Sequence, residues 1–387
     1  MVSFDNTEIA FSGKSDADLR RSFWLFRMIG SPTFVKIGKA MTTFALNLHL
    51  PIKGMIKATI FKQFVGGETI EECNRTVEVL GKFRIGTILD YSVEGKESEM
   101  DFDACCAETI ATVERAKNDL HIPFCVFKVT GLARFALLEK VSAREKLSVE
   151  EASEFKRIHQ RVEKICSTAH QHGKPIFIDA EESWIQHAID ELADDMMLKL
   201  NKEKAIVYNT FQLYRKDRLG FLRKSLERAK QHNYILGAKL VRGAYMEKER
   251  ARAEKMNYPS PIQDTKENTD RDYDAALHFC VGHIDRIAVC AGTHNESSSL
   301  LLVKALEEKN IVHDHPHIFF SQLLGMSDHI SFNLASDNYN VAKYVPYGPV
   351  KEVLPYLIRR AQENTSVKGQ TGRELSLIIK EKKRRRN

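Results

Sequence analysis

The chain has 387 residues, of which 43% are hydrophobic and 28% are charged, so it is predicted to be a soluble globular protein of one large domain or two domains. Its net charge of +6 is modest, and five basic residues stand together at positions 382–386, so the composition does not favour nucleic-acid binding. The sequence has no run of the roughly 18 apolar residues that a membrane-spanning helix requires.

The cysteine pattern and the N-terminal residues bear on the cellular compartment in which the protein is expected. Seven scattered cysteines form no C-x-x-C pair, so neither a disulfide framework nor a zinc cluster is predicted, and a reducing environment is favoured. Residues 1–16 mix acidic, polar and single apolar residues, so no signal peptide is expected. We therefore expect a cytoplasmic protein, or one bound peripherally to the inner face of a membrane.

Residues 1–80 are predicted to be an N-terminal helical segment. Apolar residues recur at helical spacing from Asp16, and Pro32 interrupts the pattern. A second apolar region runs from Met41 to Ile60. The aromatic residues of this segment are expected to pack on a larger body, and contact with a membrane surface through Leu46 to Phe64 is the alternative.

From residue 81 to 367, strand-like and helix-like segments alternate. Amphipathic stretches such as Val149–His172 separate short runs rich in β-branched and aromatic residues. The eight predicted strands are Phe83–Tyr91, Cys125–Val129, Pro175–Asp179, Ala205–Gln212, Leu236–Arg242, Arg286–Ala291, His317–Gln322 and Val341–Val345. Eight β-then-α units predict an α/β fold, a (β/α)8 TIM-type barrel that follows the N-terminal helical subdomain. A doubly wound open sheet is the alternative. Residues 368–387 are expected to be a basic, disordered C-terminal tail.

The ends of the predicted strands are unusually polar. In a (β/α)8 barrel the functional residues gather at the C-terminal ends of the strands. Buried charges there cost several kcal/mol unless a ligand or partner satisfies them, so we interpret this rim as a binding site. The polar residues are Lys128 and Thr130; Asp179, Glu181 and Glu182; Asn209 and Gln212; Lys239, Arg242 and Tyr245; Thr293, His294 and Asn295; Ser321 and Gln322; and Tyr344.

The last predicted helix of the barrel carries a second polar pattern. Tyr356, Arg359, Arg360 and Glu363 recur at i, i+3, i+4 and i+7, so they share one face of the helix. Two arginines that face a cavity would suit a small anionic ligand, because a guanidinium can bind a carboxylate with two hydrogen bonds. Taken alone, the pattern also fits a solvated helix face with an Arg359–Glu363 ion pair.

Several other chemistries are weighed against this set. The sequence has no G-x-G-x-x-G motif and no P-loop. A zinc site of Asp179, Glu181 and His294 lacks a closely spaced pair of ligands, so no metal is predicted. A Schiff base on Lys128 or Lys239 is disfavoured, because the surrounding cations and acid suit the binding of anionic groups.

The segment Lys239-Leu-Val-Arg-Gly-Ala-Tyr245 resembles the fifth-strand signature of the proline dehydrogenase family, which is flavin-dependent. The blocks Phe177-Ile-Asp179-Ala-Glu-Glu, Gly292-Thr293-His294-Asn295 and Gln322-Leu-Leu-Gly-Met-Ser-Asp328 match in the same order, as does the segment from Tyr344 to Glu363. The resemblance covers residues 80–368 and is to the short, single-function form. It implies a distorted barrel that holds FAD without a Rossmann motif.

The resemblance also implies roles for individual residues. Arg359, Arg360 and Lys128 match the clamp on the substrate carboxylate, and Tyr344 and Tyr356 match the aromatic wall beside the proline ring. Asp179 and Lys239 match catalytic positions next to the flavin, although Lys239 stands where many bacterial members have arginine. The residues that match flavin contacts are Ala180, Gln212, Val241, Arg242, Gly243, Tyr245, Thr293 and His294, with Glu363 pairing with an arginine beside them.

The activity implied by the resemblance is oxidation of L-proline to Δ1-pyrroline-5-carboxylate, the first step of proline degradation. Hydride would pass from C5 of proline to N5 of FAD, and a membrane quinone would reoxidise the flavin. Peripheral membrane contact is expected through the N-terminal helices or the tail. The alternatives are a hydroxyproline dehydrogenase or a folate-linked reductase of the same barrel type, and a catalytically inactive barrel that acts as a binding protein.

Overall fold

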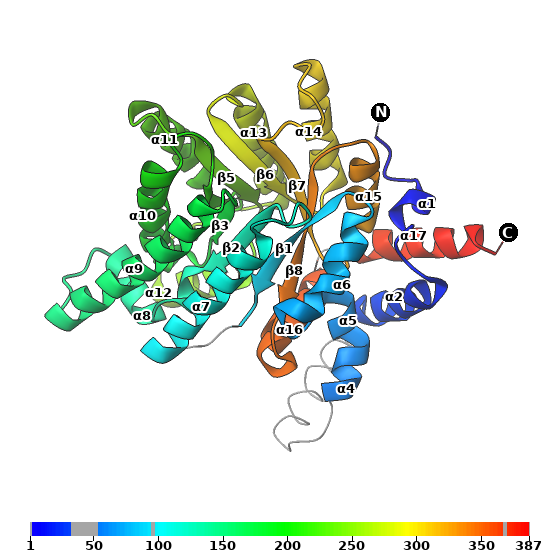
Figure 1. Cartoon of the computed structure of the whole chain (residues 1–387), viewed down its shortest axis with the longest axis horizontal. Coiled ribbons are helices and arrows are strands. Elements are labelled where there is room, and N and C mark those ends of the chain that lie inside the picture. The colour runs from blue at the N-terminus through cyan, green and yellow to red at the C-terminus, as the bar shows by residue number, and fades with distance from the viewer. Residues whose placement is uncertain (1, 32–52, 94–96, 367–369, 387) are drawn as a thin grey trace.

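The computed structural model describes residues 2–31, 53–93, 97–366 and 370–386, and within them it leaves out the side chains of 361–366, 370 and 371. Eight parallel strands form a closed barrel in the order β1-β2-β3-β4-β5-β6-β7-β8, with helices around it (Figure 1). The strands are β1 (Ile85–Tyr91), β2 (Phe124–Lys128), β3 (Ile176–Asp179), β4 (Val207–Gln212), β5 (Leu236–Val241), β6 (Ile287–Gly292), β7 (Ile318–Leu323) and β8 (Val341–Tyr347). The predicted α/β barrel with its eight strands is confirmed.

Two groups of helices accompany the strands. Those that precede the barrel are α1 (Thr7–Ala10), α2 (Asp16–Ile29), α4 (Lys53–Ile56), the π-helical η1 (Lys57–Phe61), α5 (Lys62–Phe64) and α6 (Ile70–Gly81). Those within and after it are α7 (Glu99–Ala116), the 3-10 turn η2 (Val129–Gly131), α8 (Phe135–Ser142), α9 (Val149–Gln171), α10 (Ser183–Leu200), α11 (Arg218–Gln231), α12 (Met246–Met256), α13 (Lys266–Gly282), α14 (Glu296–Glu308), α15 (Asp328–Ser336), α16 (Val350–Ser366) and α17 (Gln370–Arg384).

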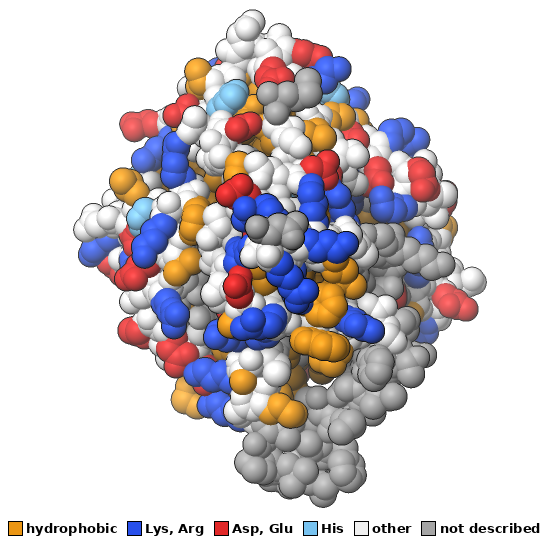
Figure 2. All heavy atoms as spheres, turned by 90° about the vertical axis from the view of Figure 1, so that its right-hand side faces the viewer, with side chains coloured by type: hydrophobic (Ala, Val, Ile, Leu, Met, Phe, Trp, Pro, Cys, Tyr) orange, Lys and Arg blue, Asp and Glu red, His pale blue; other side chains and the backbone are white. Residues whose placement is uncertain are grey.

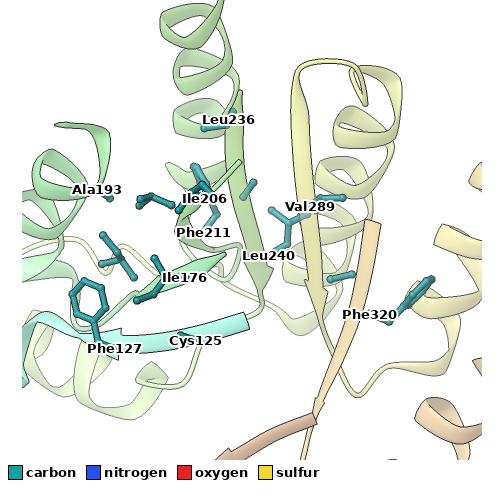
Figure 3. Packing of buried hydrophobic residues seen from close by; sticks show 14 of the residues in the cluster. Cys125, Phe127, Ile176, Ala193, Ile206, Phe211, Leu236, Leu240, Val289 and Phe320 are labelled. Carbon is teal, nitrogen blue, oxygen red and sulfur yellow. The ribbon is translucent and has the colours of Figure 1, made fainter. Parts of the chain in front are cut away.

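The main core lies between the outer face of the barrel and the surrounding helices. Outward-facing residues such as Phe127, Ile176, Phe211 and Leu240 are buried there (Figure 3). Because successive side chains of a strand point to opposite faces, the alternate residues face the inside of the barrel. This alternation decides which side chains can reach a ligand at the barrel mouth.

A second core joins the two ends of the chain. Phe26 of α2, Phe64 of α5, Leu357 of α16 and Ile378 of α17 are buried in one cluster. In Figure 1, α17 lies beside α2. The expectation of a disordered tail is therefore wrong for residues 370–384, because α17 buries Leu377 and Ile378 against the N-terminal helices. Residues 41–52 of the predicted second apolar region lie outside the described residues.

Charged side chains also fasten the N-terminal helices to the barrel. Asp328, at the start of α15, lies 2.8 Å from the ammonium of Lys343 on β8 and 2.7 Å from that of Lys14. Lys343 is fully buried, and its ammonium also donates to the Met326 carbonyl at 2.5 Å. Burial alone would raise the pKa of Asp328, but the charges of Lys14 and Lys343 outweigh it and hold that pKa well below its usual range.

We predict that Asp328→Asn lowers the free energy of unfolding by about 3–5 kcal/mol, because it leaves the buried Lys343 without its counter-charge. Urea denaturation at neutral pH measures the loss. An acid with a lowered pKa stabilises the fold above its unfolded pKa of about 3.9, so the difference between wild type and variant should shrink as the pH falls below that value. Lys14→Met is the control and should cost less, because Asp328 still faces Lys343. Equal losses in the two variants would contradict the assignment.

Candidate active site

The inside of the barrel changes character along its axis. Its lower part is apolar, with Phe124, Phe177 and Tyr208 packed together and the rings of Phe124 and Phe177 stacked 4.4 Å apart. At the C-terminal ends the inward-facing positions are charged or hydroxylated. Asp90, Lys128, Asp179 and Tyr344 each stand two residues after an inward-facing apolar residue, and Lys239 stands two residues after a glycine. The barrel therefore has a dry floor and a polar mouth.

Lys239 is at the centre of this mouth. Its ammonium lies 2.5 Å from an Asp179 carboxylate oxygen, donates to the Tyr344 hydroxyl, and lies 4.2 Å from the centroid of the Tyr344 ring. The Tyr344 hydroxyl in turn donates to Asp179 at 3.2 Å. Burial, together with the negative charge of Asp179, raises the pKa of Tyr344 well above its usual value, so the phenol stays protonated. β3, β5 and β8 thus hold one compact, mutually paired group.

Lys128 ends β2 directly beside Asp179 in the sheet register. The turn that follows it is fixed by Glu181, whose carboxylate accepts hydrogen bonds from the Thr130 N–H at 3.1 Å and the Thr130 hydroxyl at 2.5 Å. Burial raises the pKa of Glu181 to about 7. Burial also raises the pKa of Asp90. The nearby positive charge of Lys128 acts in the opposite direction and reduces this increase. Lys128 therefore stands at a rigid strand end, close to the carboxyl groups of Asp90 and Glu181.

In the cavity wall between β5 and β6, the side chain of Arg242 is engaged by neighbouring protein groups, so this wall presents mainly backbone groups to a ligand. The Arg242 guanidinium donates to Asp270 at 2.6 Å, Thr293 at 2.7 Å and Ser298 at 2.9 Å, so it braces this wall. Gly243 has φ +134°, and a Cβ there would lie 2.4 Å from the Tyr214 ring. Glycine alone suits that backbone, which turns away from the strand at the cavity.

His294 follows β6 and also lines the cavity. Its Nδ1 lies 2.9 Å from the hydroxyl of Ser327. Burial lowers the pKa of His294 to about 3, so the ring is neutral near pH 7. A neutral imidazole has one donor and one acceptor nitrogen, so its hydrogen bond to Ser327 fixes what the other nitrogen can do.

The helix α16 covers the mouth from the side of β8. Tyr356 and Arg360 are buried, and the Arg360 guanidinium lies 5.2 Å from the centroid of the Tyr356 ring. Arg359, which is partly exposed, lines the same cavity. Together the strand ends and α16 line an open cavity of about 700 Å³.

The comparisons with known proteins agree with this geometry. The family model described as proline dehydrogenase matches residues 73–373. The chain belongs to the proline dehydrogenase family. It is 35% identical over 384 residues to "Proline dehydrogenase 1, mitochondrial" of Dictyostelium discoideum, covering 88% of this chain and 67% of that protein. It is 32% identical over 413 residues to "Hydroxyproline dehydrogenase" of Xenopus laevis, covering 97% of this chain and 88% of that protein.

Solved structures show the same fold. Proline utilization A from Bdellovibrio bacteriovorus, inactivated by N-propargylglycine, superposes with a TM-score of 0.72 at 18% identity over 94% of this chain. This chain spans only 37% of the length of that protein, and at such low identity the match shows the fold alone. The family match makes the protein an oxidoreductase of the proline dehydrogenase family.

The structure brings the predicted residues of this family member together. Lining the cavity are Lys128, Asp179, Ala180, Gln212, Lys239, Val241, Arg242, Gly243, Tyr245, Thr293, His294, Tyr344, Tyr356, Arg359 and Arg360. The side chain of Glu363 lies outside the described residues. The residues weighed as zinc ligands bond elsewhere: Asp179 to Lys239, Glu181 to Thr130 and His294 to Ser327.

Sequence reasoning missed other residues of the cavity, among them Asp90, Lys266, Glu296, His329 and Arg373. Asp90 could have been predicted from the sequence, since it is a carboxylate at an inward-facing position near the end of a predicted strand. Arg373 could not have been predicted as a cavity residue, because it belongs to the C-terminal segment that was expected to be disordered. Its guanidinium donates to Glu296 at 2.8 Å and to Asp5 at 2.9 Å.

We predict that Asp179→Ala lowers the rate of substrate oxidation by about a hundredfold or more, because the positions of Lys239 and Tyr344 inside the cavity depend on this carboxylate. The melting temperature should fall as well, because the buried Lys239 loses its counter-charge. Steady-state kinetics and thermal unfolding measure the two effects. Asp179→Asn is the matched control, since it keeps an acceptor for Tyr344 but removes the charge: it should lower the melting temperature less than Asp179→Ala does, while its rate stays as low. A large fall in melting temperature with normal residual activity would show that Asp179 is structural.

Proposed function

We propose that this protein oxidises L-proline to Δ1-pyrroline-5-carboxylate with FAD as its cofactor. The observation that carries the proposal is one cavity with cationic side chains of α16 and β2 and, beside them, the paired Lys239, Asp179 and Tyr344. A small, cyclic amino acid needs a cationic clamp for its carboxylate and a flat apolar wall for its ring. The cationic side chains and the tyrosine rings that line the cavity support both roles.

The substrate carboxylate would be bound by Arg359, Arg360 and Lys128. Guanidinium groups can bind a carboxylate through two hydrogen bonds each, which fixes the orientation of the ring as well as its position. The same positive charges disfavour protonation of the nearby secondary amine, so they help to keep proline in its reactive, neutral form. Tyr344 and Tyr356 would supply the apolar surface against the ring methylenes.

The chain also offers groups that fit a flavin dinucleotide. The backbone of Val241–Gly243 lines the cavity, and glycine is needed at residue 243 because a Cβ there would collide with the Tyr214 ring. Side chains or backbone of Ala180, Gln212, Tyr245, Thr293 and His294 would provide further contacts, and Gln212 is held by its hydrogen bond to the Glu181 carbonyl at 2.7 Å. When bound, FAD would supply the hydride acceptor, and the residues around it would supply orientation and electrostatics.

The electron acceptor is proposed to be a quinone, with the protein docked peripherally on a membrane. In the part of the chain that the structure describes, no helix is long and apolar enough to span a bilayer. The face that carries α2 and α17 is turned to the viewer in Figure 2, where lysine and arginine side chains surround apolar ones. Trp24 and Met28 of α2 are 59% and 49% exposed, and Arg27 lies over the Trp24 ring.

Apolar residues flanked by cations support contact with an anionic lipid surface. Sedimentation with vesicles rich in phosphatidylserine tests this contact: Trp24→Ser should weaken it several-fold, and wild-type protein that stays in solution would overturn it. The cytoplasmic location remains an expectation, because the relative from Dictyostelium discoideum is named as mitochondrial.

Oxidation of hydroxyproline is the second candidate function. It is favoured by the relative from Xenopus laevis, which is named for that substrate and matches 97% of this chain. The Tyr344 ring favours proline instead, because a ring hydroxyl placed against it would lose water without gaining a good partner. The folate-linked reductase and the inactive binding protein have no comparable support.

The experiment that tests the proposal is anaerobic addition of cyclic amino acids to purified protein. The protein should be yellow, and L-proline alone should bleach its flavin absorbance. Bleaching by trans-4-hydroxy-L-proline but not by L-proline would favour the second candidate. Colourless protein that does not bind added FAD would overturn the proposal.

We predict that Arg359→Ala raises the KM for L-proline by about 30-fold to several hundredfold, since it removes a charge-assisted contact of about 2–4 kcal/mol. FAD should be retained, because Arg359 is assigned to the substrate. Lys351→Ala is the matched control, an exposed cation on the same helix, and should leave the KM unchanged. A KM for Arg359→Ala within about threefold of the wild-type value, a loss below 1 kcal/mol, would remove Arg359 from the clamp.

We predict that wild-type protein prefers L-proline over trans-4-hydroxy-L-proline by about tenfold to a hundredfold in kcat/KM, because an unsatisfied hydroxyl costs roughly 1–3 kcal/mol. Tyr344→Ser should narrow this preference, mostly by weakening proline oxidation, since it opens space and adds a small hydroxyl. Steady-state kinetics with both substrates decide the matter. If the selectivity ratio is unchanged in the variant, Tyr344 does not contact the substrate ring.

A further inference from the structure

The start of α15 differs from the starts of other helices that follow a serine. Ser15, Ser98 and Ser148 each accept a hydrogen bond from a backbone N–H in the first turn of their own helix. Ser327 occupies the same position before α15, but its side chain makes no such bond. Its hydroxyl lies instead 2.9 Å from Nδ1 of His294 in the cavity wall.

The backbone of Ser327 is also unusual. It has φ +52° and ψ +41°, a left-handed conformation that costs a residue other than glycine roughly 1–2 kcal/mol. The residue is fully buried, so its N–H needs an acceptor inside the protein. That acceptor is the carboxylate of Glu374 on α17, which is itself 3% exposed. A carboxylate at the start of a helix is further stabilised by the helix dipole.

Other polar side chains hold the same loop from different elements. Gln63 of α5 donates to the Gly325 carbonyl at 2.8 Å, and Lys343 of β8 donates to the Met326 carbonyl at 2.5 Å. Glu374 adds the contact nearest to His294. The loop between β7 and α15 is thus fixed on consecutive residues, 325, 326 and 327.

We propose that Glu374 is a positioning residue for the active site: by accepting the Ser327 N–H, as the acid of a capping box does, it holds Ser327 in the left-handed conformation in which the serine hydroxyl meets His294. With the Ser327 hydroxyl as the donor in this contact, the proton of the neutral His294 ring resides on Nε2. His294 can then donate from Nε2 to an acceptor atom of the bound cofactor. The assignment of that acceptor to FAD rests on the proposed function, whereas the tautomer of His294 does not.

The test compares two buried carboxylates of α17. Glu374 contacts Ser327, whereas Glu381 is fully buried but binds Arg384 and Arg385 away from the cavity. In ¹⁵N-histidine-labelled protein, with His294→Asn used for assignment, we expect Glu374→Ala to move His294 from the Nε2–H tautomer to a mixture. The affinity for FAD, measured by quenching of flavin fluorescence, should fall about tenfold. Glu374→Gln, which keeps an acceptor oxygen, should restore most of both.

Glu381→Ala is the control, and it should lower the melting temperature while leaving the tautomer and the affinity for FAD within about twofold of wild type. Glu374→Ala with a wild-type tautomer would overturn the proposal, and so would equal effects of Glu374→Ala and Glu381→Ala on His294. If wild-type protein binds no FAD, the proposed function fails, and the NMR measurement still decides the role of Glu374.

Discussion

The ammonium of Lys239 on β5 and the carboxylate of Asp179 on β3 lie 2.5 Å apart inside the barrel, with 7% and 14% of their side chains exposed. Removing two such charges from water costs several kcal/mol each, and the cost is recovered only when the geometry satisfies both. Tyr344 completes the arrangement by bonding both partners from β8. The aromatic floor of Phe124, Phe177 and Tyr208 excludes water beneath them, which strengthens each electrostatic contact above.

The closure of the site depends on both ends of the chain. α16 brings Arg359 and Arg360 to the mouth, and α17 brings Arg373 to the mouth and Glu374 to the loop before α15. Both helices pack in a core shared with α2 and α5, so the N-terminal and C-terminal segments form one support for the mouth of the barrel. The same segments carry the exposed Trp24 and Met28, which places the proposed membrane contact on the support rather than on the barrel.

The sequence was sufficient to predict the barrel and most of its polar mouth. Eight apolar runs separated by amphipathic helices leave few alternatives, and a polar residue that ends a strand must lie at the same rim as its neighbours, as Lys128 and Asp179 do. It was not sufficient to predict side-chain direction or long-range contacts. Arg242 follows β5 as expected, yet its guanidinium braces the wall through Asp270, because the alternation along the strand directs it outward. The role of Glu374 was not predicted, because its partner Ser327 lies far away in the sequence, at the start of α15. The apolar face of α17 was not predicted either, because the basic residues at 382–386 suggested a disordered tail.

Lys239 and Asp179 are expected to stabilise the protein as one coupled pair, and a double-mutant cycle with Lys239→Met and Asp179→Asn measures this coupling. The free energies of unfolding of the wild type, both single variants and the double variant would be obtained from urea denaturation. We expect the double variant to be more stable than the sum of the single losses predicts, with a coupling energy of about 1–3 kcal/mol. Losses that add within about 0.5 kcal/mol would contradict the claim, because such additivity is the behaviour of residues that do not interact.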